Sequence, residues 1–86
     1  MNKVNEKTME NELYRHIEVA KHYASHKFQA IAPIIPEIDT AWTLYVVYFY
    51  PNSTKIFNSY FLRRFSSEEE LRIFCDMQNI ELDESE

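Results

Sequence analysis

The fold is decided by residues 42–65, which read WTLYVVYFYPNSTKIFNSYFLRRF. Residues 42–50 and 55–65 are rich in β-branched and aromatic side chains, which favour β-strands. Pro51 and Asn52 lie between them and suit the second and third positions of a type I turn. We therefore expect an antiparallel hairpin in which Tyr50 pairs with Lys55 across residues 51–54.

Both faces of this hairpin are expected to be apolar. Side chains alternate between the two faces of a strand, so the register through Tyr50 and Lys55 puts one set on each face. The first face carries Trp42, Leu44, Val46, Tyr48, Phe57, Ser59, Phe61 and Arg63. The second face carries Thr43, Tyr45, Val47, Phe49, Ile56, Asn58, Tyr60, Leu62 and Arg64.

A long helix is expected before the hairpin. Within residues 8–31, apolar side chains recur every three or four positions, as on one side of a helix: Met9, Leu13, Ile17, Ala20, Ala24, Phe28 and Ile31. Pro33 limits the helix, because the residue before a proline avoids helical geometry. Residues 32–40 then form an extended connector that places Ile34 or Ile35 on the core, or a short extra strand that Pro36 confines to a sheet edge.

A short helix and an acidic tail follow the hairpin. Ser66 and Ser67 precede Glu69 and Glu70 at the spacing of a capping box, which predicts a helix start. Leu71, Phe74 and Cys75 should face the core. Asn79 can adopt the left-handed conformation that ends a helix, so that Ile80 folds back onto the helix.

These elements predict an α+β fold in one domain, residues 1–86, with flexible ends at 1–7 and 81–86. The 86 residues carry a net charge of −5 and include no glycine. Without glycine the chain has no P-loop, no dinucleotide-binding loop and no nucleophile elbow. Residues 1–8 do not resemble a secretory signal, and no apolar run reaches the roughly 18 residues of a membrane span. We expect a cytoplasmic protein without membrane contact.

Catalytic and metal-binding patterns are weak. Glu18, His22 and His26 have the helical spacing by which side chains can share a metal ion, but no further ligand accompanies them. Cys75 is the single cysteine and belongs to an apolar helix face, where a thiol is inert. We therefore expect no enzymatic activity, no cofactor, no metal site and no small-molecule substrate.

The second face of the hairpin is the candidate binding site. If both helices cover the first face, the second is exposed, and an exposed apolar patch is typical of an interaction site. If the helices lie one on each face, or the connector covers the second face, its side chains are core. The first case predicts a non-enzymatic interaction module, either a homodimer or a regulator or inhibitor of another protein, with these contact residues: Tyr45, Val47, Phe49, Ile56, Tyr60, Leu62 and Arg64.

Two alternative functions remain open. An acidic surface could imitate DNA and inhibit a nucleic-acid-acting enzyme; it would use Glu68, Glu69, Glu70, Asp76, Asp83 and Glu84. The aromatic hairpin could instead stack single-stranded bases. The net charge of −5 opposes phosphate binding, so we expect a protein partner or a second copy rather than nucleic acid.

Overall fold

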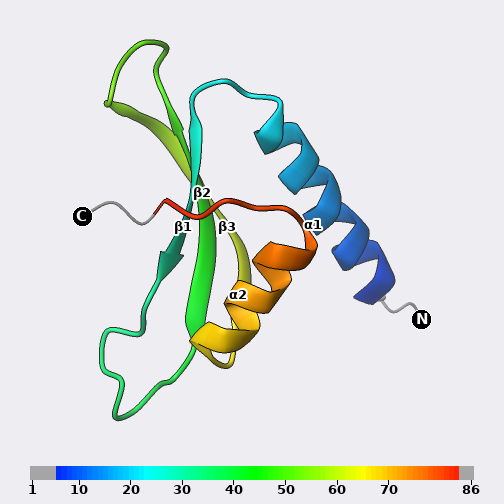
Figure 1. Ribbon diagram of the computed structural model, residues 1–86, viewed down its shortest axis with the longest axis vertical. Coiled ribbons are helices and arrows are strands. Elements are labelled where there is room, and N and C mark those ends of the chain that lie inside the picture. The colour runs from blue at the N-terminus through cyan, green and yellow to red at the C-terminus, as the bar shows by residue number, and fades with distance from the viewer. Residues whose placement is uncertain (1–5, 84–86) are drawn as a thin grey trace.

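The computed structural model describes the backbone of residues 6–83 and the side chains of residues 11–83, and it confirms the α+β class (Figure 1). The elements are α1 (Glu6–Lys21), β1 (His26–Ile31), β2 (Trp42–Phe49), β3 (Ile56–Phe65) and α2 (Glu68–Met77). The strands form one antiparallel sheet in the order β1-β2-β3. Both helices pack on the same face of this sheet (Figure 1).

The predicted long helix is wrong beyond Lys21. The amides of His22 and Tyr23 bond to the carbonyls three residues earlier, which closes the last turn of α1. The following residues form β1, whose Phe28 pairs with Val46 of β2. Phe28 fits a helical stripe, but it also belongs to the alternating set His26, Phe28 and Ala30. Hydrogen bonding to β2 determines whether these residues follow the helical repeat or the two-residue repeat of a strand.

The connector between β1 and β2 lies at the surface rather than on the core. The amides of Ile38 and Asp39 both bond to the carbonyl of Ile35, which makes a tight turn there. Ile34 is 94% exposed and Ile35 is also exposed, so the expectation that one of them reaches the core is wrong. The sheet does have a third strand at its edge, but that strand is β1 and not this connector.

The hairpin turn lies at the expected residues, but its type I geometry and the register of the strands are not as expected, since the third residue of a type I turn has a negative φ. The amide of Tyr50 donates to the carbonyl of Lys55 at 3.0 Å, and Asn52 has a positive φ of 57°. β-bulges between Tyr48 and Phe49 and between Leu44 and Tyr45 then shift the pairing. A bulge adds one residue to a strand, and each residue beyond it faces the opposite side.

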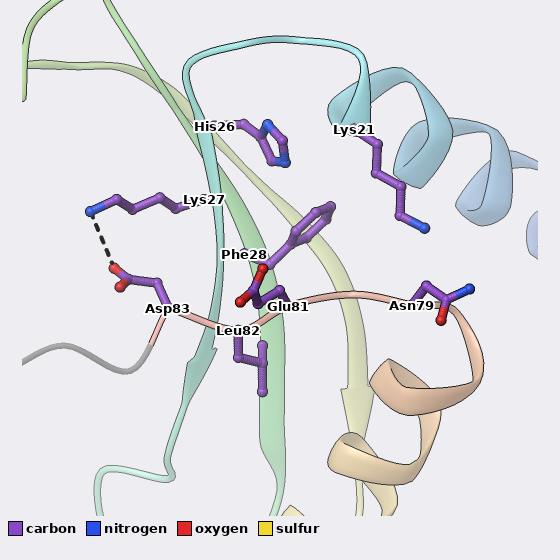
Figure 2. Close-up of a pocket in the computed structure, with 8 residues that line it drawn as sticks. All are labelled: Lys21, His26, Lys27, Phe28, Asn79, Glu81, Leu82 and Asp83. Carbon is purple, nitrogen blue, oxygen red and sulfur yellow. Dashed lines mark ion pairs between the residues drawn. The ribbon is translucent and has the colours of Figure 1, made fainter.

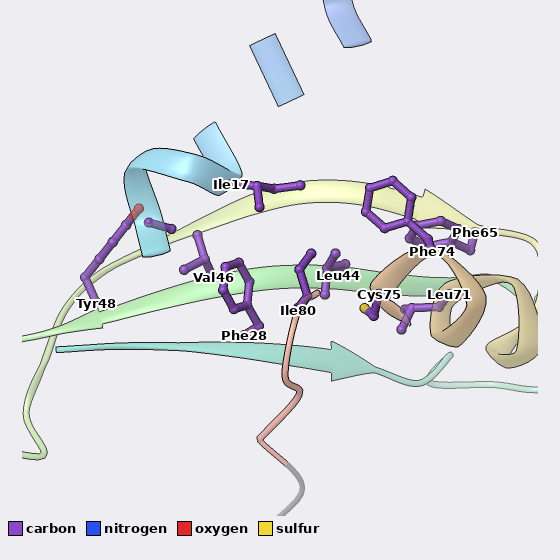
Figure 3. Packing of buried hydrophobic residues seen from close by; sticks show 11 residues of the cluster. Ile17, Phe28, Leu44, Val46, Tyr48, Phe65, Leu71, Phe74, Cys75 and Ile80 are labelled. Atoms are coloured by element: carbon purple, nitrogen blue, oxygen red, sulfur yellow. The ribbon is translucent and has the colours of Figure 1, made fainter. Parts of the chain in front are cut away.

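The core lies between the sheet and the two helices (Figure 3). α1 contributes Ile17 and Ala20, and α2 contributes Leu71, Phe74 and Cys75. The strands and the end of the chain supply the remaining buried members of the cluster: Phe28, Leu44, Val46, Tyr48, Phe65 and Ile80. Because all the helical members meet one face of the sheet, that face carries the core.

Both ends of α2 agree with the sequence analysis. Ser67 is the N-cap, and its hydroxyl accepts a hydrogen bond from the amide of Glu70. Asn79 has a φ of 57°, and the amide of Ile80 donates to the carbonyl of Cys75 at 2.8 Å. The chain then turns toward β1, where residues 81–83, which we expected to be flexible, lie along the outer edge of that strand.

Candidate functional site

The side of the sheet opposite the two helices is called the open face here. Its members follow from the alternation of each strand and the pairing between strands. In β1 they are Lys27, Gln29 and Ile31, in β2 Thr43, Tyr45, Val47 and Phe49, and in β3 Ile56, Ser59, Phe61 and Arg64. Neither helix covers these side chains.

The structure brings five of the seven predicted contact residues onto the open face: Tyr45, Val47, Phe49, Ile56 and Arg64. Tyr60 and Leu62 do not join them, and their placement on the second face is wrong. The Tyr60 ring lies on the helix side, with its centroid 5.1 Å from that of the His16 ring and 5.7 Å from that of the Tyr48 ring. Leu62 packs against the core.

Phe61 takes the place that sequence reasoning gave to Tyr60. It pairs with Tyr45, and the two rings meet edge to face with their centroids 5.9 Å apart. The Phe61 side chain is 57% exposed. The residues around the bulge include no glycine or proline that could mark it, so the sequence gives no signal for this exchange.

Val47 lies on the open face but is only 6% exposed. It is on the central strand, between Lys27 of β1 and Ser59 of β3, with Tyr45 and Phe49 on either side along β2. Val47 therefore forms the floor of the face, while the rings around it are the groups that a partner can reach.

A hollow of about 470 Å³ lies at one end of the open face, between the sheet and the connector. Its lining includes Ile35 and Ile38 of the connector together with Tyr45 and Arg64 of the sheet. Ile38 is 80% exposed. The connector thus extends the apolar surface beyond the strands, whereas the sequence analysis had expected Ile34 or Ile35 to lie on the core.

The charges on the open face are paired within the chain. Arg64 contacts the carboxylate of Asp39 at 2.9 Å, and Lys27 lies 3.5 Å from that of Asp83. Lys27 also lies over the ring of Phe49, 5.6 Å from its centroid. The face is consequently apolar at its centre and close to neutral at its margins.

The predicted acidic surface is divided by the structure. Glu68 pairs with Arg72 at 2.9 Å, and Glu70 accepts a hydrogen bond from Ser66 at 2.6 Å. Asp83 pairs with Lys27 of β1, away from the other carboxylates, because residues 82 and 83 lie along that strand. Glu69 and Asp76 are exposed, and Glu84 lies outside the described residues.

The histidines do not form the helical cluster that their spacing suggested. α1 ends before His22, whose Nδ1 lies 2.8 Å from the carbonyl of Glu18, and His26 belongs to β1. Within the part of the chain that the structure describes, no three potential metal-ligating side chains come together. Cys75 is buried, and burial, with a smaller contribution from Asp76, raises the pKa of its thiol to about 11.

A second hollow, of about 460 Å³, lies between β1, the end of α1 and the tail (Figure 2). Lys21, Lys27, Glu81 and Asp83 all line it. Lys27 pairs with Asp83 in this hollow, and the Lys21 ammonium donates to the carbonyl of Gln78. Because both charge signs are present, the hollow does not favour an ionic ligand of either sign.

Comparisons with known proteins leave the function to be argued from this geometry. No protein family, no curated protein and no solved structure matches the chain. Among the helices of residues 6–83, none has the length and apolar character needed to cross a bilayer.

Proposed function

We propose that the protein is a non-enzymatic interaction module that binds a second copy of itself through the open face. The observation that carries this proposal is an aromatic pair on a sheet face that neither helix covers, in which Phe61 is exposed and Tyr45 is partly exposed. Apolar patches of this kind are typical of protein interaction sites. Tyrosine and phenylalanine are enriched in such sites because they bury a large area.

The charges of the open face favour a second copy over nucleic acid. Both of its cations, Lys27 and Arg64, already have carboxylate partners in the same chain. Two neutral faces can approach without repulsion, whereas binding to phosphates depends on cations that are free to replace counterions. Two sheets can stack about 10 Å apart with interdigitated side chains, and the helices would then lie on the outside of the dimer.

The area of the face sets a further condition. Three strands spaced about 4.8 Å apart, with about 3.3 Å per residue over the 8 residues of β2, project roughly 380 Å². A standard interface buries about 800 Å² of accessible surface per partner. Side chains make the accessible area larger than the projected area. The difference between the area of the open face and that of a standard interface nevertheless favours a contribution from the connector. Ile34 and Ile38 adjoin the face and are available for it.

Light scattering coupled to size-exclusion chromatography tests the proposal. At about 100 µM, the wild-type chain should be a dimer if its dissociation constant is micromolar. Replacing both rings of the pair, Tyr45→Ser with Phe61→Ser, should give a monomer whose circular dichroism spectrum is unchanged. The matched control is Tyr60→Ser, which removes a ring from the helix side and should leave the dimer intact.

A wild-type monomer at this concentration would overturn self-association. A dimer that persists in the double variant would show that the contact lies elsewhere on the molecule. If the wild type is monomeric but captures another protein in a way that needs Tyr45 and Phe61, the face serves a regulator or inhibitor instead.

A further inference from the structure

The two edges of the sheet differ in what lies beside them. The tail occupies the outer edge of β1, where Leu82 forms a parallel bridge with Phe28 and the amide of Asp83 donates to the carbonyl of Phe28. β3 is the other terminal strand of the sheet. Within residues 6–83, no backbone hydrogen bond outside the β2–β3 hairpin reaches β3.

An unpaired edge strand of this length is a template for another strand. β3 has 10 residues, and the side chains of its first six are all exposed. The amide of Ser59 donates to the side-chain oxygen of its neighbour Asn58 at 2.8 Å. Since that bond is local and at the surface, an incoming strand can compete for this amide.

An apolar groove lies beside this edge, between α1 and the helix side of β3. It has a volume of about 470 Å³, and its lining includes Val19 and Tyr23 of the α1 region and Phe57 and Tyr60 of β3. Val19 is 58% exposed although it belongs to a helix that packs on the sheet. Side chains from one face of an added strand would enter this groove.

The charge along the hairpin indicates what kind of strand would fit. Residues 40–67 contain Lys55, Arg63 and Arg64 and no acidic residue. Lys55 lies over the ring of Tyr50, and Arg63 lies over the rings of Phe65 and Phe74. Among the described residues neither of these two cations forms an ion pair, whereas Arg64 pairs with Asp39. One unpaired cation is therefore available near each end of β3.

We propose that the outer edge of β3 binds an extended peptide segment of a partner protein, apolar in its middle and acidic near both ends. Main-chain hydrogen bonds to β3 supply affinity, as in other cases of strand addition. The groove selects apolar side chains, and Lys55 and Arg63 select carboxylates. The tail combines the same two kinds of contact at the edge of β1: Leu82 packs on the core, and the Asp83 carboxylate pairs with Lys27.

This edge site is separate from the open face used for self-association. Two sheets stacked face to face leave their outer edges free. Tyr45 lies on the central strand, away from the outer edge of β3. Tyr45→Ser should therefore weaken the dimer and leave peptide binding unchanged, so that the failure of either proposal can be recognised without reference to the other.

The test uses a fluorescent peptide of alternating valine and threonine with a glutamate at each end. A length of about nine residues spans β3 at roughly 3.3 Å per residue. We expect fluorescence anisotropy to give a dissociation constant of about 0.1 mM. A peptide with the same side chains and N-methyl groups on alternate amides should not bind, because it cannot complete the ladder. A version with lysine at both ends should bind several-fold more weakly.

Two protein variants locate the site. Val19→Asp places a carboxylate at the groove and should weaken binding at least tenfold. Ile73→Asp makes the same kind of change at an exposed position of α2 outside the groove and should have no effect. Absence of binding at millimolar peptide, equal binding of the N-methylated peptide, or equal effects of the two variants would each overturn the proposal.

Discussion

The amide of Asp83 donates a 2.8 Å hydrogen bond to the carbonyl oxygen of Phe28. This bond joins the end of the chain to the first strand and places Leu82 beside the core cluster. The Asp83 carboxylate lies 3.5 Å from the ammonium group of Lys27. The tail therefore protects an edge of the sheet that would otherwise be open to other strands.

Removal of the tail should lower the stability of the domain. Ending the chain after Ile80 removes the half-buried Leu82 and the bond to Phe28, which should reduce the free energy of unfolding by about 1–2 kcal/mol. Urea denaturation followed by circular dichroism measures this change. Lys27→Gln leaves the docked segment in place, removes the ion pair with Asp83 and the contact with the Phe49 ring, and should cost less than about 1 kcal/mol. An equal loss in the two variants would mean that the ion pair, and not the docked segment, carries the effect.

Leu44→Ala on β2 should destabilise the protein more than Phe61→Ala on the neighbouring strand β3. Leu44 is 0% exposed at the centre of the core, and emptying such a site costs about 3–5 kcal/mol. That loss is a large part of the roughly 5–15 kcal/mol that stabilises an ordinary domain. Phe61→Ala removes a larger side chain from the open face and should cost the monomer much less. Comparable urea midpoints for the two variants would contradict the assignment of the core to the helix side.

The N-cap of α2 is also open to a matched pair of substitutions. Ser67→Ala removes the hydroxyl that accepts from the amide of Glu70, and the free energy of unfolding should fall by about 1 kcal/mol. Ser67→Gly should lower the free energy of unfolding by only about a few tenths of a kcal/mol, because glycine is tolerated at the N-cap. Thermal and urea unfolding give both values. If alanine and glycine were equally damaging, loss of the cap would not be the cause.

Stability should fall at alkaline pH partly because of Cys75. The pKa of its thiol is raised from 9.0 to about 11 by burial and by Asp76, which means that the folded state favours the neutral form. Above pH 9 the unfolded chain releases the thiol proton more readily, so this contribution to stability is lost as the pH rises from 9.0 to about 11. Urea midpoints across this range should decline less steeply in Cys75→Ala. Identical slopes for this variant and the wild type would contradict the prediction.

The connector isoleucines provide a test of the dimer that does not involve the sheet. Ile34→Ser with Ile38→Ser should weaken self-association by at least about tenfold, because each residue adds apolar area next to the open face. Both side chains are almost fully exposed, so the urea midpoint of the isolated protomer should not change. Sedimentation analysis over a dilution series measures the dissociation constant. An unaltered dimer would confine the interface to the strands.

Some parts of the candidate site could be predicted from sequence and others could not. The alternation of β2 placed Tyr45, Val47 and Phe49 together, because neighbouring side chains of one strand have fixed relative directions. The pairing of β3 with β2 depends on the bulges, which moved Tyr60 to the helix side and brought Phe61 out. A bulge changes the register between strands, and the local sequence does not encode it without a glycine or a similar mark.

The sequence by itself determined the strands of the hairpin, the position of its turn, the caps of α2 and the absence of glycine-dependent sites, since each depends on neighbouring residues alone. Only the tertiary structure decided that residues 26–31 form β1 rather than helix, because the gain from pairing with β2 outweighs a helical pattern of similar strength. It also decided that both helices lie on one face of the sheet. That choice depends on how buried area is shared among elements distant in the chain, and it leaves Phe61 exposed and Tyr45 partly exposed.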